Sequence, residues 1–135
     1  MDRGWVKANT AIRSTRSPEN GAVFWSGYDK GNKDSAQGFA HSIGGKTVEM
    51  TQAGKWLDQK WPWDKLQSRI GTDASKKVWD DTSRRFAHGA SGEVNAFIKD
   101  MRGEPDFPDK TYMKIERPIL THRSNNKVTK LHEHE

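Results

Sequence analysis

The sequence predicts one α+β domain over residues 1–135, in which a mainly helical N-terminal part packs on a short, mostly parallel sheet. Three observations lead to this fold class. The chain has 135 residues, which is enough for one domain with a modest core. Short apolar runs typical of strands alternate with segments whose apolar residues recur at helical spacing. No internal repeat divides the chain.

Composition limits the class of protein. The formal net charge is +5 and the pI is about 9.5, so the surface favours an anionic partner such as nucleic acid, a nucleotide or an acidic protein. The absence of cysteine excludes a disulfide framework and thiolate chemistry. The sequence contains no run of about 18 apolar residues and no apolar signal core. It therefore fits a protein that works in a reducing cytosol, or a module cut from a larger chain.

The N-terminal part begins with a polar lead-in. Residues 1–20 are rich in Arg, Ser and Asn, and a short helix is expected around residues 5–12. The predicted core, residues 21–120, opens with the apolar run 22–25. This run predicts a short buried strand that stops at a Ser-Gly turn.

A helix is predicted next, between residues 29 and 43. Apolar residues recur there at helical spacing, with Asp34 or Ser35 as the cap and a pair of glycines beginning at Gly44 as the stop. Residues 46–50 then alternate like a strand or an extended turn.

Two short helices follow. Thr51 is placed to cap a helix over residues 52–60. Pro62 ends that helix and suits the first turn of a second helix over residues 63–70. Residues 71–73, Gly-Thr-Asp, are expected to form a loop.

Residues 77–90 are the stretch around which the fold is expected to be organised. A short apolar run ends at Trp79, and Thr82 or Ser83 can cap a helix. The pattern therefore predicts a strand that runs into a helix over residues 83–101. The free N–H groups and the dipole of such a helix start would bind phosphate. An ordinary capped helix beside a buried tryptophan explains the same pattern without a ligand.

The C-terminal part is predicted to contain one more strand. Residues 111–120 alternate in polarity, and Pro118 is expected near the end of that strand or on a sheet edge. The polar residues 121–135 are expected to form a weak hairpin at Asn125-Asn126 or a disordered tail.

Candidate site residues fall at the ends of predicted extended segments: Trp25, Glu49, Trp79 with Ser83, and Glu116. Ligands bind parallel sheets outside the carboxyl ends of the strands, so these side chains are expected to converge. Two indole rings, two carboxylates and a helix start suit a substrate with an anionic middle, flat groups and a developing positive charge. Such a charge develops when a glycosidic bond is cleaved.

Four blocks of sequence resemble the ADP-ribosyl cyclase / NAD glycohydrolase family, in the family's order. They are VFWS at 23–26, TVEMT at 47–51, VWDDTSRRFA at 78–87 and TYMKIE at 111–116. The resemblance covers roughly residues 22–120, and the pattern Trp-x-x-x-Ser-Arg-Arg-Phe is its most specific part. The sequence departs from the family at two positions: Met50 replaces the usual Asp of the signature, and Gly27 stands where some members carry Arg.

The resemblance implies an ADP-ribosyl cyclase-like fold. It also implies a role in the site for each of several residues. Glu116 would be the catalytic residue, and Trp25 and Trp79 would line the site. Glu49 would contact the nicotinamide amide and favour hydrolysis over cyclisation. Further contacts, mainly to the phosphates of the substrate, would come from Ser83, Ser26 and Thr111. NAD would be the substrate, so no separate cofactor and no metal are expected.

A compact, cysteine-free, basic member resembles bacterial toxin domains carried by larger secreted effectors. The resemblance implies that the domain depletes NAD in the cytoplasm of a target cell and is bound by a cognate immunity protein. No membrane or nucleic-acid partner is expected on this reading.

Two other functions stay open on the sequence alone. A basic ribonuclease-type toxin could use His41 and His88 as acid and base. A non-enzymatic module could bind nucleic acid through its charge of +5. Other prominent side chains are interpreted as packing residues or as a solvated face: Trp56, Trp61 and Trp63, and Arg84 with Arg85.

Overall fold

A computed structural model describes residues 3–28 and 30–135 of the chain. Residues 1–2 of the lead-in, and Asp29 at the start of the predicted helix 29–43, lie outside the described residues. The helices are α1 (Arg3–Ala11), α2 (Lys30–Ile43), α3 (Gln52–Lys60), α4 (Trp63–Ile70), α5 (Thr72–His88) and α6 (Arg117–Thr121). The strands are β1 (Val23–Trp25), β2 (Gly92–Phe97) and β3 (Val128–His134). Three short turns are η1 (Val48–Met50), η2 (Phe107–Asp109) and the π-helical η3 (Tyr112–Glu116).

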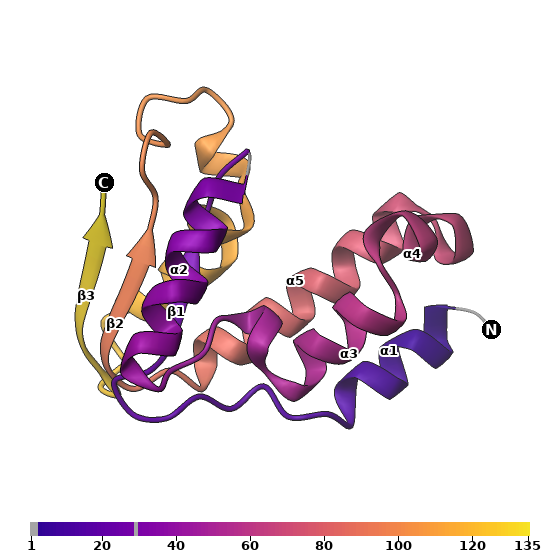
Figure 1. The fold of residues 1–135 in the computed structure, drawn as a ribbon, viewed down its shortest axis with the longest axis horizontal. Helices are drawn as coiled ribbons and strands as arrows, with labels where there is room; N and C mark the ends of the chain where they lie inside the picture. The colour runs from indigo at the N-terminus through magenta and orange to yellow at the C-terminus, as the bar shows by residue number, and fades with distance from the viewer. Residues whose placement is uncertain (1–2, 29) are drawn as a thin grey trace.

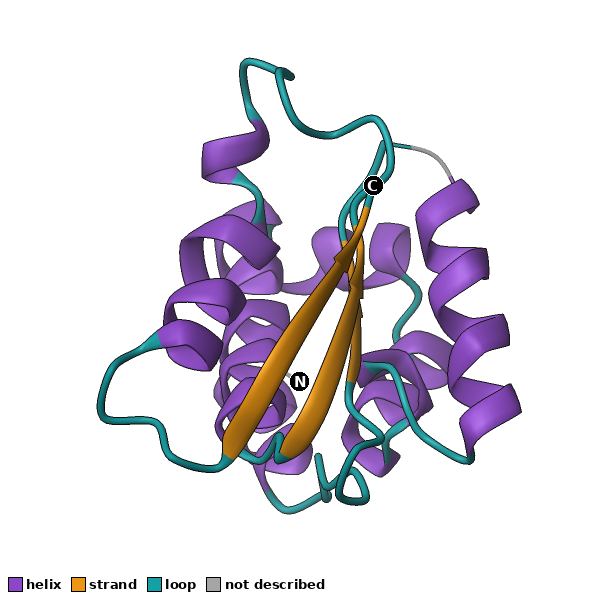
Figure 2. Ribbon diagram, turned by 90° about the vertical axis from the view of Figure 1, so that its left-hand side faces the viewer, coloured by secondary structure: helices purple, strands orange, loops and turns teal. Residues whose placement is uncertain are grey.

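The molecule has a sheet half and a helical half, joined by α5 (Figure 1). The sheet order is β1-β2-β3, and both strand pairs are parallel. Helix α2 packs against one face of the sheet, while α5, η3 and α6 pack on the other (Figure 2). The predicted α+β class with a short parallel sheet is confirmed. No helix within the described residues is long and apolar enough to cross a membrane.

The two halves have separate hydrophobic clusters, and α5 contributes to both. The sheet cluster includes Phe24, Val94 and Ile98, and it receives Phe86 from α5. The helical cluster consists of Val6, Leu57, Trp61 and Leu66, together with Val78 from α5. Large apolar side chains buried in this way supply most of the favourable free energy of folding.

Several local predictions are confirmed. Helix α1 and strand β1 lie close to the bounds predicted for them, and α3 and α4 have the predicted bounds. Thr51 caps α3, because its side-chain oxygen accepts a hydrogen bond of 3.1 Å from the Gly54 N–H. Helix α2 ends just before Gly44, which has a φ of 69°, as expected for a glycine stop.

The predicted cap of α2 is wrong, and of the two alternatives for residues 46–50, a strand or an extended turn, the strand does not form. Helix α2 already begins at Lys30, so Asp34 and Ser35 lie inside it. In residues 46–50, only Lys46 makes an isolated parallel bridge, to Ala22. The chain then makes the single 3-10 turn η1, which packs directly against α3. Gly54 permits this approach, since a Cβ atom there would lie 1.8 Å from the Val48 carbonyl oxygen.

The predicted strand-to-helix junction at residues 77–90 is wrong, because residues 77–88 belong to one long helix, α5. Val78, Thr82 and Phe86 are all buried and recur every four residues, which is a helical period. Thr82 donates a 2.8 Å hydrogen bond to the Val78 carbonyl within the helix and caps nothing. The expected loop at 71–73 is reduced to Gly71, whose φ of 88° lets α5 start at once after α4.

Three predictions after α5 are also wrong. The helix expected over 83–101 ends at His88, and Gly92–Phe97 forms β2, with Val94 and Ala96 facing the core. The strand expected over 111–120 is helical, since η3 runs into α6 and Pro118 occupies the first turn of α6. The expected tail or hairpin contains β3, which pairs in parallel with β2 and so forms no hairpin.

Candidate active site

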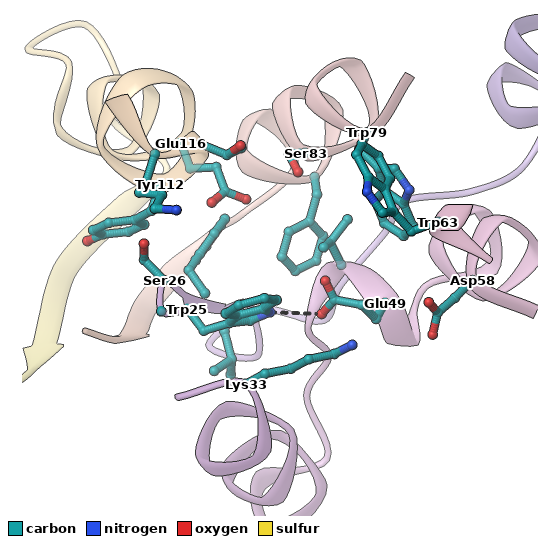
Figure 3. Close-up of a pocket in the computed structure, with 17 residues that line it drawn as sticks. Trp25, Ser26, Lys33, Glu49, Asp58, Trp63, Trp79, Ser83, Tyr112 and Glu116 are labelled. Atoms are coloured by element: carbon teal, nitrogen blue, oxygen red, sulfur yellow. Dashed lines mark hydrogen bonds between the residues drawn. The ribbon is translucent and has the colours of Figure 1, made fainter. Parts of the chain in front are cut away.

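A cleft of about 370 Å³ opens between the end of β1, η1, α5 and η3 (Figure 3). The structure brings together all the site residues that the sequence suggested: Trp25, Ser26, Glu49, Trp79, Ser83, Thr111 and Glu116. Only the first two come from the end of a strand; the others come from helical turns. Their convergence is therefore produced by the packing of α5 and η3 on the sheet, and their roles in binding and catalysis stay predictions.

One wall of the cleft joins β1 to η1. The Trp25 indole N–H donates a 3.0 Å hydrogen bond to the Glu49 carboxylate (Figure 3). Because η1 packs on α3 at Gly54, the Glu49 backbone is fixed close to the helical half. The ammonium of Lys33, from α2, lies 5.9 Å from the centroid of the Trp25 ring. The ring and the carboxylate thus present an apolar face and a negative charge to the same space.

The opposite wall is one face of α5. Trp79 and Ser83 are four residues apart, so they lie one above the other on that face. Ser83 lies near Glu116 and lowers the pKa of that carboxyl group. It lies in the middle of a helix, and the predicted phosphate site at a helix start beside Ser83 is therefore wrong.

Glu116 is a buried carboxyl group at the head of the cleft, with 6% of its surface exposed. Burial raises the pKa of Glu116 well above 4.5, and the negative charges of Glu49 and Asp80 raise it further. The neighbouring Ser83 hydroxyl acts in the opposite direction and lowers this pKa. The free protein thus holds a carboxyl group whose ionisation a cationic ligand would favour.

The turn that carries Glu116 is anchored to β3. The Tyr112 hydroxyl donates a 2.6 Å hydrogen bond to Glu133, and Nε of Arg117 donates to the same carboxylate at 3.0 Å. Burial and the hydrogen bond to Glu133 raise the pKa of Tyr112, so its hydroxyl remains a donor. Thr111 donates a 3.1 Å hydrogen bond to Asp80 of α5. Both flanks of η3 are thereby fixed.

No protein-family model matches the chain, and no curated protein matches it significantly. Solved structures do match its backbone. Aplysia cyclase in complex with the substrate NGD and the product cGDPR is 26% identical, with a TM-score of 0.62 over 86% of this chain and 49% of that chain. An ADP-ribosyl cyclase with N1-cIDPR is 24% identical, with a TM-score of 0.67 over 98% of this chain and 56% of that chain.

Porcine CD38, in complex with a covalent intermediate, is 22% identical, with a TM-score of 0.59 over 89% of this chain and 54% of that chain. The chain has the ADP-ribosyl cyclase fold. It spans about half the length of these structures. The fold expected from the resemblance is therefore confirmed, whereas membership of a bacterial toxin group stays a prediction.

In this version of the ADP-ribosyl cyclase fold, the cleft also contains side chains that the sequence did not suggest: Lys33, Asp58, Trp63, Lys110 and Tyr112. The sequence predicts a packing role for Trp63, but this side chain is 43% exposed and lines the cleft. Most of these residues come from helices whose position depends on tertiary packing, for which local spacing gives no signal. Tyr112 is the exception, because it lies one helical turn before Glu116.

The remaining residues singled out in the sequence lie elsewhere. Met50 packs against the buried Val23, Ala36 and Ala40 and is not among the residues that line the cleft. Trp56 and Trp61 pack in the helical half, as interpreted. Arg84 pairs with Asp81, and Arg85 donates hydrogen bonds to carbonyls at the end of α1. The ribonuclease alternative receives no support from the cleft, because His41 and His88 are exposed outside it.

Proposed function

We propose that the protein is an NAD glycohydrolase, which cleaves the bond between nicotinamide and ribose to give nicotinamide and ADP-ribose. Some cyclic ADP-ribose is a possible second product of the same reaction. One observation carries the proposal: a buried carboxyl group, Glu116, faces a cleft lined by Trp25 and Trp79 within an ADP-ribosyl cyclase fold. Carboxylates in this setting stabilise the cationic centre that forms when a glycosidic bond breaks.

The chemistry needs little acid catalysis. The nicotinamide of NAD is a pyridinium, so when its bond to the ribose carbon breaks, the bonding electrons leave with the ring as neutral nicotinamide. The ribose carbon is left positive. Ionised Glu116 would face this charge and accept hydrogen bonds from the ribose hydroxyls. Water then adds to the carbon and loses a proton, which gives ADP-ribose.

The walls of the cleft have separate roles in this proposal. The indole rings of Trp25 and Trp79 would hold the flat cationic ring and attract its positive charge. Glu49 would accept a hydrogen bond from the carboxamide while Trp25 fixes its position. Ser83, Ser26 and Thr111 would contact the ribose phosphate side of the substrate.

The raised pKa of Glu116 agrees with a cationic substrate. In the free protein, burial and two neighbouring carboxylates favour the protonated form. A pyridinium in the cleft introduces a compensating positive charge, which favours the ionised form. Binding and ionisation are then coupled, and the electrostatic interaction is strongest in the transition state, where the charge moves to the ribose.

The deciding experiment is turnover of NAD by the wild type and by Glu116→Gln. The variant keeps the shape and removes the charge, so turnover should fall about 100-fold or more, with a much smaller change in substrate affinity. Glu19→Gln is the matched control, because Glu19 is exposed outside the cleft. A wild type that leaves NAD intact, or a fully active Glu116→Gln variant, would overturn the proposal.

We also propose that this activity serves as a toxin, delivered as part of a larger secreted bacterial effector and neutralised by an immunity protein. The support is the resemblance to such domains and the basic, cysteine-free composition. Charge complementarity would make an acidic immunity protein bind quickly and in a salt-sensitive manner. Expression in bacteria without a partner should lower NAD and arrest growth. If these bacteria grow normally although the purified enzyme cleaves NAD, the toxin role is rejected and the proposed reaction is not.

A further inference from the structure

A second cavity, of about 340 Å³, lies beside the proposed catalytic cleft. Gly27, which follows β1, lines both of them. The second cavity is formed by the segment after β1, the start of α2 and the segment after β2, and Tyr28, Asn32 and Lys99 are among its lining residues. A ligand longer than a mononucleotide could therefore extend from one cavity into the other past Gly27.

A cation lies where the two cavities meet. Lys110 lines the catalytic cleft, and its ammonium lies 4.5 Å from the centroid of the Tyr28 ring, which lines the second cavity. Its only ion pair among the described residues is with Asp106, at 3.7 Å, and both side chains are substantially exposed. Exposed pairs of this kind contribute little energy. The ammonium is thus available to an anion that spans the junction.

The wall between the cavities is held in place by Asn32, which is 9% exposed. Its amide group donates hydrogen bonds to the Ser26 carbonyl at 2.7 Å and to the Lys99 carbonyl at 2.9 Å. It therefore ties the turn after β1 to the segment after β2. Because both bonds exist in the free protein, these two segments are held together before a ligand binds, and little conformational entropy is lost on binding.

The second cavity suits a neutral group better than another phosphate. Its charged side chains are two carboxylates, Asp100 and Glu104, and one ammonium, Lys99, which gives a net negative charge. Tyr28, 57% exposed, offers an aromatic face on which a flat ring can stack. Asn32 and Ser35 add polar groups for hydroxyls.

We infer that the two cavities form one dinucleotide site, in which Lys110 binds the pyrophosphate and the second cavity takes the adenosine against Tyr28. The inference rests on the proposed function and extends it, because it makes the second nucleoside a specificity element. In this arrangement nicotinamide mononucleotide uses the catalytic cleft alone.

Tyr28 provides the sharper kinetic test, since it lines the second cavity and is not among the residues that line the catalytic cleft. Tyr28→Ala should raise KM for NAD about tenfold and leave kcat, and KM for nicotinamide mononucleotide, within about twofold. Tyr28→Phe keeps the ring and should behave as the wild type does. Equal effects of Tyr28→Ala on both substrates, or no effect on either, would overturn the inference.

Lys110 is tested without any turnover, by calorimetric binding of ADP-ribose, which has the pyrophosphate and adenosine but no nicotinamide. Lys110→Ala and Tyr28→Ala should each raise the Kd for ADP-ribose about tenfold, the effect of losing one charge-assisted or stacking contact. Lys114→Ala is the matched control, because Lys114 is exposed and lines neither cavity.

The two proposals can fail separately. If the wild type binds ADP-ribose with the expected variant pattern but cleaves no NAD, the proposed reaction fails and the dinucleotide site stands. If NAD is cleaved while both variants bind ADP-ribose as the wild type does, the dinucleotide site is overturned. Absence of ADP-ribose binding by the wild type also overturns it.

Discussion

Glu116 combines burial with two negatively charged neighbours, and this has a direct consequence for the pH dependence of activity. If ionised Glu116 is required, kcat/KM for NAD should fall as the pH drops through the raised pKa of the free enzyme, above the ordinary 4.5. Asp80→Asn removes one of the charges that raise this pKa, so the midpoint of the acid limb should move to lower pH.

The comparison between neighbouring aspartates makes this prediction specific. Asparagine at position 80 keeps an oxygen that can accept the hydrogen bond from Thr111, so the change is mainly one of charge. Asp81→Asn is the control, because Asp81 pairs with Arg84 on the exposed side of α5 and does not act on Glu116. If Asp80→Asn leaves the pH midpoint of the acid limb unchanged, a group other than Glu116 controls that limb.

The same carboxyl group should make the folded protein less stable at neutral pH. A folded pKa above the unfolded value means that the native state binds a proton that the unfolded chain releases. The destabilisation is therefore absent below the unfolded pKa, grows as the pH rises through the folded pKa, and is complete above it. Glu116→Gln should raise the free energy of unfolding at pH 8 by about 1–3 kcal/mol.

Urea unfolding of the wild type and Glu116→Gln at pH 8 and near pH 4 checks this prediction. The two curves should differ at pH 8 and converge near pH 4, where the wild-type carboxyl is protonated in both states. Glu19→Gln should show no difference at either pH, because that side chain is exposed. A variant less stable than the wild type at pH 8 would contradict the assigned origin of the raised pKa.

Among the elements, the π-helical turn η3 depends most on a distant partner. Burial alone would raise the pKa of Glu133, but hydrogen bonds from Arg117 and Tyr112 outweigh it and lower the pKa. Its stabilising contribution is thus present above the unfolded pKa and lost as the pH falls through the folded pKa. Glu133→Gln should lower the free energy of unfolding at pH 7 by about 2 kcal/mol, with a smaller loss at acid pH.

Urea unfolding at both pH values measures this contribution, and kcat for NAD reports on η3. Because the anchor holds the turn that carries Glu116, kcat should fall while KM changes little. Glu135→Gln is the matched control, since Glu135 is half-exposed and its one ion pair within residues 3–28 and 30–135 is with the exposed Arg102. Equal stability losses for the two variants would show that the anchor of η3 has no special role.

The elements also show what local patterns could and could not predict. Thr51 was placed correctly as a cap because a cap depends on residues three positions apart. The run from Val78 to Phe86 has a helical period, but Trp79 and its apolar neighbour resembled the end of a strand. Residues 111–116 show a two-residue alternation, although Tyr112 and Glu116 are also one helical turn apart, and tertiary packing selected the turn. Strands β2 and β3 pair in parallel and are far apart in the sequence. No turn residues between them therefore indicate the pairing.

For the whole molecule, the sequence indicated several residues that line the cleft but not the geometry that brings them together. The four blocks identify side chains whose chemical types match a reaction, and the structure brings them to one cleft. The reason expected for their convergence, strand ends meeting at one edge of a sheet, applies only to Trp25 and Ser26. Lys33, Asp58 and Trp63 belong to the cleft through the docking of separate helices, which depends on the whole fold.

At this scale, α5 also predicts how the protein unfolds. It buries Val78 in the helical cluster and Phe86 in the sheet cluster, and the cleft lies between the two halves. A helix shared by both cores should make them unfold as one cooperative unit. Leu57 in the helical core and Ile98 in the sheet core are both 0% exposed, so Leu57→Ala and Ile98→Ala should each cost about 2–5 kcal/mol.

Native-state hydrogen exchange tests the cooperativity directly. In Leu57→Ala, the amides of β2 should lose as much protection as those of α3, although the mutation lies in the other half. Ile98→Ala should produce the same pattern in reverse. Loss of protection confined to the mutated half would mean that the halves open independently, and the cleft could then open without global unfolding. A shared loss would mean that Trp79 and Glu116 keep their relative positions until the whole chain unfolds, because α5 links the two cores.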